Sequence, residues 1–134
     1  MRLKNRLITT LALGTVVTAL TGVGLAAPAQ AASIVCCSYA TDFAASVSWD
    51  PDGEHYYLED SACDGHSAVI VNFRSDLNPS GPYYGWNPDG CYTTKDYNLN
   101  MPEGTTVWFQ ACLGEYGTRT VLWDTCGTEM LSTA

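Results

Sequence analysis

The sequence predicts an all-β protein, a disulfide-stapled antiparallel β-sandwich loosely of the immunoglobulin or fibronectin type. Short segments rich in β-branched and aromatic residues follow one another, with glycine- and proline-containing turns between them. This spacing is typical of sandwiches and barrels. Six cysteines are the second indication, because small exported domains often supplement a thin core with disulfides. No segment has the apolar period of a helix of useful length.

Residues 1–31 have the features of a signal peptide. Three basic residues within the first six precede an apolar run over residues 7–27, and the Ala29-Gln30-Ala31 motif supplies the small side chains that a signal peptidase reads. Cleavage after Ala31 leaves residues 32–134 as a single secreted domain. An uncleaved membrane anchor is the alternative, and the Ala-Gln-Ala motif argues against it.

The expected mature chain is strongly acidic. All 14 acidic residues lie in residues 32–134 together with only three basic ones, Arg74, Lys95 and Arg119, which gives a net charge of −11. Such a surface repels phosphate backbones and anionic lipids. We therefore expect an extracellular protein or a glycan as the partner, and neither nucleic acid nor a membrane. No cofactor is indicated.

The stretch Ser67–Arg74 is expected to be the central strand. It follows the turn signal Asp64-Gly65, and its residues alternate between two faces. We assign the buried face to Val69, Val71 and Phe73. The second, mixed face then carries Ala68, Ile70, Asn72 and Arg74.

The other strands are placed around this one in chain order. Residues 32–40 are expected to form an edge strand, and residues 43–59 a hairpin that turns at Pro51-Asp52-Gly53. Prolines and glycines make residues 76–84 a loop. Further strands are expected over residues 97–101, 105–112 and 120–124. In the second of these, one face carries Val107, Phe109 and Ala111.

Two stretches of this pattern occur together with a cysteine near the C-terminus: Asp64-Gly65-His66-Ser67-Ala68 at the start of the central strand, and Val-Trp-Phe-Gln-Ala-Cys at residues 107–112. With these features, residues 60–127 resemble small secreted actinobacterial β-rich proteins. The resemblance implies a β-rich fold and an extracellular address, and it supplies no catalytic residues. The cysteines at positions 36, 37, 63 and 91 depart from that pattern.

The six cysteines are expected to form three disulfides. Cys112 and Cys126 flank the last hairpin, and we predict that they pair with each other. They face one another if the turn is centred on Arg119, whereas a turn at residues 115–117 would leave Cys126 about 20 Å along the strand. We therefore predict the register centred on Arg119. The pairing of the remaining four stays open: Cys36, Cys37, Cys63 and Cys91.

A calcium site is one candidate for ligand binding. Asp50, Asp52 and Glu54 place three carboxylates at alternate positions around a turn, and calcium prefers 6–8 oxygen ligands. The alternative, which we favour, is that these residues cap the turn and keep the surface soluble.

Aromatic residues around the loop at residues 83–92 are the second candidate. Tyr83, Tyr84, Trp86 and Tyr92 could present exposed rings that stack on sugars. Aromatic residues gathered in a loop more often form a satellite hydrophobic cluster beneath it, and this alternative stays open.

The residues do not favour an enzyme. His66 and Ser67 are adjacent in an expected strand and so point to opposite faces, and no Gly-x-Ser-x-Gly elbow occurs. The function we infer is a non-enzymatic binding module, for a glycan or a cell-surface component, that acts through the loop at residues 83–92. The alternative is an extracellular inhibitor or interaction protein that presents a disulfide-clamped loop to a secreted enzyme.

Overall fold

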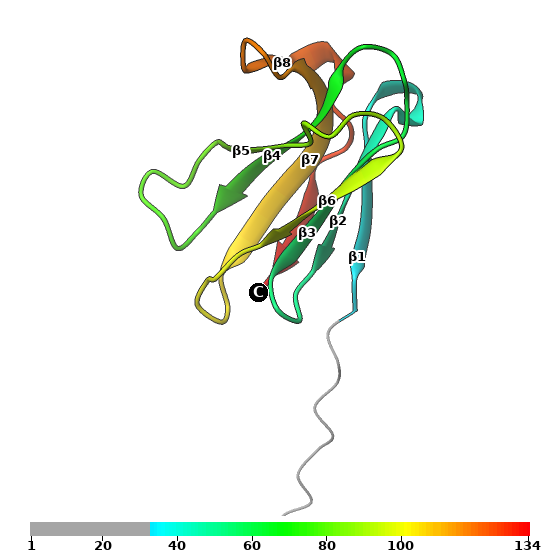
Figure 1. The fold of residues 1–134 in the computed structure, drawn as a ribbon. Coiled ribbons are helices and arrows are strands. Elements are labelled where there is room, and N and C mark those ends of the chain that lie inside the picture. Colours follow the sequence, from blue (N-terminus) through cyan, green and yellow to red (C-terminus); the bar gives the residue numbers. More distant parts are fainter. Residues whose placement is uncertain (1–32) are drawn as a thin grey trace, which may run out of the picture.

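Residues 33–134 of the computed structural model are described, and they fold into nine strands in two antiparallel sheets that pack face to face (Figure 1). The expected signal peptide and its cleavage site lie outside the described residues. The all-β sandwich predicted from the sequence is thus confirmed. No helix in the described part of the chain is long and apolar enough to span a membrane.

The first sheet contains four strands in the order β1-β2-β3-β6. Their bounds are β1 Val35–Tyr39, β2 Ala45–Asp50, β3 His55–Asp60 and β6 Thr93–Asn98. The second sheet has the order β5-β4-β7-β8, and β9 also pairs with β7. Its strands are β5 Tyr83–Trp86, β4 Ser67–Arg74, β7 Thr106–Glu115, β8 Thr120–Leu122 and β9 Met130–Thr133. These orders differ from the ABED and CFG sheets of an immunoglobulin constant domain, so the likeness extends to the two-sheet architecture alone.

The central strand β4 has the predicted bounds, and it lies between β5 and β7. The assignment of its faces was wrong. Ala68 and Ile70, expected on the mixed face, lie in the main core between the sheets, whereas Val69 and Val71 belong to a second cluster on the outer face. All four are at most 1% exposed. Alternation could not identify the inner face, because both faces of this strand are apolar.

The main core fills the space between the two sheets. Its largest fully buried side chains are Trp49, Tyr56 and Leu58 from the first sheet, and Ile70 and Phe109 from the second. The Tyr56 ring lies between Trp49 and Phe109, with ring centroids 4.6 and 5.3 Å away. As predicted, Val107, Phe109 and Ala111 of β7 all face this core.

Several strand boundaries differ from those expected. A 3-10 turn, η1 (Thr41–Phe43), precedes β2, and the positive φ angles of Asp42 and Phe43 interrupt the extended backbone there. The strand expected at residues 97–101 is β6, which begins at Thr93. The last expected strand ends at Leu122, where the 3-10 turn η2 (Trp123–Thr125) begins. Neither β5 nor β9 was expected, because strands of four residues carry little local signal.

The predicted disulfide between Cys112 and Cys126 is present, with a Cα–Cα distance of 4.1 Å. The predicted register was wrong. Leu113 pairs with Leu122, which centres the turn between Gly117 and Thr118 rather than on Arg119. The chain then leaves the strand at η2, and this turn brings Cys126 back beside β7. The other bridges are Cys36–Cys37 and Cys63–Cys91.

One lateral side of the sandwich is closed where β1 meets the segment after η2. The Ala111 N–H of β7 donates to Ser38 Oγ of β1 at 3.0 Å, and the Ala111 carbonyl accepts the Gly127 N–H at 2.8 Å. Leu113 N–H donates to Thr125 Oγ1 at 2.8 Å. Between the part of β7 that pairs with β8 and the part that pairs with β9, this edge of β7 has no neighbouring strand. The three hydrogen bonds give the backbone groups there the partners that buried backbone groups need.

The close approach of Gly127 to β1 is tested by substituting alanine for this glycine. A Cβ at this position would collide with the Tyr39 carbonyl group, which is backbone and cannot move aside without shifting β1. We expect Gly127→Ala to lower the free energy of unfolding by about 2–3 kcal/mol, which corresponds to a fall in melting temperature of about 10–20 °C. Gly117→Ala is the control, because a Cβ there meets nothing within 4 Å. Equal melting temperatures for the two variants would contradict the close approach.

Candidate functional site

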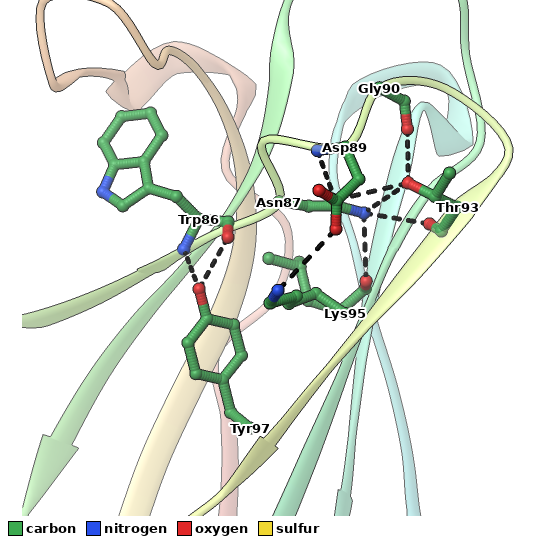
Figure 2. Close-up of polar contacts among 8 residues, drawn as sticks. Trp86, Asn87, Asp89, Gly90, Thr93, Lys95 and Tyr97 are labelled. Carbon is green, nitrogen blue, oxygen red and sulfur yellow. Dashed lines mark hydrogen bonds and ion pairs between the residues drawn. The ribbon is translucent and has the colours of Figure 1, made fainter.

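At the opposite side of the sandwich, a tyrosine hydroxyl bridges β5 and β6. Tyr97 of β6 reaches across to β5, where its hydroxyl accepts the Trp86 N–H at 2.7 Å and donates to the Trp86 carbonyl at 2.6 Å (Figure 2). The hydroxyl thus satisfies both backbone groups of Trp86, although it comes from the other sheet. Gly85 allows this approach, since a Cβ there would lie 3.1 Å from the Tyr97 ring.

The connection from β5 to β6 is fixed by the buried side chain of Asn87. Its Nδ2 donates to the Thr93 carbonyl at 2.9 Å, and its Oδ1 accepts the Asp89 N–H at 3.1 Å (Figure 2). Lys95 and Asp89 form an ion pair across the same connection at 3.7 Å. These contacts therefore fix the position of the end of β5 relative to the start of β6.

A pocket of about 210 Å³ lies at this side of the sandwich. Tyr56 and Ile70, both 1% exposed, belong to its lining and also to the main core, so they form its floor. Residues of both sheets, of the loop before β5 and of the segment after β6 complete the lining: Asn72, Arg74, Leu77, Tyr83, Tyr84, Gly85, Tyr97 and Leu99. The pocket is thus rich in tyrosine, and its interior combines apolar surface with a few polar groups.

The polar groups of the pocket differ in how they are satisfied. Asn72 Nδ2 donates to the Tyr83 carbonyl at 3.1 Å. Arg74 donates from Nε and Nη2 to the two carboxylate oxygens of Asp76, at 3.0 and 2.7 Å, and these hydrogen bonds lower the pKa of Asp76. The hydroxyl of Tyr56 is buried and has no hydrogen-bond partner among the described residues. Burial raises the pKa of Tyr56, so this hydroxyl is a neutral donor.

The structure separates the four predicted aromatic residues. Tyr83 and Tyr84 line the pocket and are 37% and 45% exposed. Trp86 is only 7% exposed and packs in the outer-face cluster, where a Cβ on Gly114 would lie 2.8 Å from its ring. Tyr92 is 78% exposed but is not part of the pocket lining. The loop therefore contains both a buried cluster, centred on Trp86, and exposed rings.

The calcium candidates lie at the turn between β2 and β3. Asp50 Oδ1 accepts the Asp52 N–H at 3.0 Å, the same local hydrogen bond that Asn87 makes with Asp89 in the later Asn-Pro-Asp-Gly turn. Among residues 33–134, no three or more His, Cys, Asp or Glu side chains lie together in a group that could hold a metal ion. The bond identifies a turn-capping role for Asp50.

Sequence reasoning missed the residues that shape the pocket, chiefly Tyr56, Asn72 and Tyr97. Tyr56 was assigned only to a short strand, and Asn72 to the mixed face of the central strand. The one local signal for Tyr97 is that it is the single aromatic residue in the polar strand Thr93–Asn98.

Comparison with known protein families, with curated proteins and with solved structures finds no match to this chain. The site is therefore interpreted from its own geometry and chemistry.

Asp60 gives a pH-dependent test of the packing at the end of β3. This carboxylate, at the end of β3, is 1% exposed, and its Oδ2 has no partner among the described residues. Burial raises its pKa above the ordinary value of 3.8. Between pH 3.8 and the higher folded-state pKa, the folded protein binds more protons than the unfolded chain, so stability from this group falls as the pH rises.

We therefore expect wild type to lose stability relative to Asp60→Asn as the pH increases from about 3.8 through the folded-state pKa of Asp60. The measurement is urea unfolding of both proteins at a series of pH values, and the difference in their unfolding free energies is compared. A difference that stays constant with pH, or that changes in the opposite direction, would contradict the raised pKa.

Proposed function

We propose that this protein is an extracellular, non-enzymatic module that binds a glycan at the pocket between β5 and β6. The observation that carries the proposal is that two partly exposed tyrosines, Tyr83 and Tyr84, belong to the lining of a pocket of about 210 Å³. Aromatic rings offer flat apolar faces, and tyrosine adds a polar hydroxyl, a combination suited to sugar rings that have apolar faces and hydroxylated edges.

The pocket is held in place before any ligand binds, which favours a binding role. The Tyr83 hydroxyl donates to the Pro79 carbonyl at 2.7 Å, and the Tyr83 carbonyl accepts from Asn72. The Tyr97 hydroxyl fixes the neighbouring edge strand. A site that is ordered in advance loses less conformational entropy on binding.

The extracellular part of the proposal is supported by the disulfides and by the charge. Three disulfides in so small a domain are typical of proteins that fold in oxidising compartments. The strongly acidic chain is a poor match for nucleic acids and anionic lipids, and a neutral glycan avoids that repulsion.

The proposal is tested by affinity electrophoresis of the disulfide-bonded protein through gels that contain single soluble polysaccharides, both neutral and acidic. We expect a neutral polysaccharide to retard the wild-type protein. Tyr83→Ala and Tyr84→Ala should each weaken the retardation about tenfold, as expected when an aromatic contact worth about 1.4 kcal/mol is removed.

Tyr92→Ala is the matched control, because Tyr92 is an exposed tyrosine outside the pocket. It should be retarded as strongly as wild type. If Tyr92→Ala lost the retardation while Tyr83→Ala and Tyr84→Ala kept it, the binding site would lie outside the pocket. Absence of retardation by every polysaccharide would argue against glycan binding.

The second candidate function is inhibition of a secreted enzyme by the hairpin formed by β7 and β8. The Cys112–Cys126 bridge clamps this hairpin at its base, and the hairpin forms one end of the molecule (Figure 1). However, the Arg119 guanidinium lies 3.8 Å from the centroid of the Tyr116 ring and 5.6 Å from that of Trp86. The side chains near the tip thus fold back onto the domain, so we favour the pocket.

A further inference from the structure

We infer that the pocket recognises the end of a glycan chain: a single neutral sugar residue enters between the sheets and places an oxygen acceptor on the Tyr56 hydroxyl. This inference rests on the proposed function and specifies which part of the glycan is bound and by which group.

The shape of the pocket admits a chain end and excludes a chain interior. Its floor consists of Tyr56 and Ile70, which pack into the main core, so a glycan cannot pass through. Its volume of about 210 Å³ is below the roughly 300–1,000 Å³ typical of sites for drug-sized ligands. On one side the pocket ends at the Tyr97 side chain, whose hydroxyl bonds β5. A pocket that is closed at its base and this small accommodates one ring.

The Tyr56 hydroxyl is the group that the ligand is expected to satisfy. Three buried side-chain polar atoms lack a partner among the described residues, and only Tyr56 belongs to the pocket lining. A buried hydroxyl without a partner is costly, and the large majority of buried polar side-chain atoms in folded proteins have a hydrogen-bond partner. Because this hydroxyl is neutral and can donate, the ligand must supply an acceptor such as a sugar hydroxyl, ring or carbonyl oxygen.

The charges at the pocket favour a neutral sugar over an acidic one. Arg74 is the one basic residue in the lining, and its Nε and Nη2 atoms already donate to Asp76. The Asp76 carboxylate neutralises the guanidinium, and the low pKa of Asp76 keeps this pair ionised. A carboxylate on the ligand would therefore find no unpaired basic side chain in the pocket lining, and the net negative charge of the protein would repel it.

The rest of the chain would lie over exposed aromatic surface at the mouth of the pocket. Tyr84 is in edge-to-face contact with Trp123 of η2, with ring centroids 6.4 Å apart, and Trp123 is 55% exposed. The aromatic surface therefore continues from the pocket towards the second sheet's outer face. The sugar residue next to the bound end can contact this surface while the end residue occupies the pocket.

The inference is tested by titration calorimetry with cellotetraose, chitotetraose and mannotetraose. Each tetrasaccharide is used free and with bulky substituents on both ends, and a tetragalacturonate serves as the acidic probe. We expect at least one free neutral tetrasaccharide to bind, with affinity lost when both ends are blocked and no binding of the tetragalacturonate.

Tyr56→Phe isolates the hydroxyl, because it keeps the ring and the packing against Trp49 and Phe109. We expect it to weaken binding about three- to tenfold, the effect of losing one hydrogen bond. Tyr57→Phe is the matched control, since Tyr57 is the neighbouring residue on β3 and does not line the pocket. Removing an unpartnered hydroxyl should also leave the melting temperature of Tyr56→Phe unchanged or raise it.

The outcomes distinguish this inference from the proposed function. If free and doubly blocked tetrasaccharides bind equally, and Tyr56→Phe binds like wild type while Tyr84→Ala does not, glycan binding stands and recognition of the chain end is overturned. A melting temperature of Tyr56→Phe that falls by several degrees would assign the hydroxyl to the fold and also overturn the inference. If no probe binds wild type and no polysaccharide retards it, both proposals fail.

Discussion

The hydroxyl of Tyr97 is the contact on which the pocket depends. The edge strand β5 has only four residues, and Trp86 directs its N–H and carbonyl to this hydroxyl rather than to another strand. Because Tyr97 belongs to the first sheet and Trp86 to the second, this side chain links the two sheets at this side. Gly85 is the local requirement for that approach, since a side chain there would crowd the Tyr97 ring.

The two lateral sides of the sandwich are held in different ways, and the pocket lies at only one of them. On the side of β1, the two sheets approach closely: Gly127 packs against the Tyr39 backbone, and Ser38 Oγ accepts the Ala111 N–H of β7. On the side of β5 and β6, a long side chain spans the gap. The space beside it is the pocket, and the core residue Tyr56 forms part of its floor.

The sequence predicted the features that arise from local patterns. The bounds of Ser67–Arg74 and the inward face of β7 follow from alternation and turn residues, and both are confirmed. The pocket could not be predicted, because Tyr56, Asn72 and Tyr97 come together only when the two sheets pack. The Cys112–Cys126 bridge illustrates both cases. The two cysteines flank a hairpin, and this position in the sequence predicted their pairing correctly. The 3-10 turn between β8 and Cys126 had no recognised signal in the sequence, so the predicted register of the hairpin was wrong.

Amide hydrogen exchange of Trp86, measured by NMR in wild type and in Tyr97→Phe, tests most directly whether this hydroxyl holds the open side together. Slow exchange in wild type is predicted, because the Trp86 N–H is bonded even though it faces no strand. In Tyr97→Phe the exchange should accelerate about tenfold or more at Trp86, while the amides of β7 stay protected. Rapid exchange at Trp86 in wild type, or the same rate in both proteins, would contradict the account.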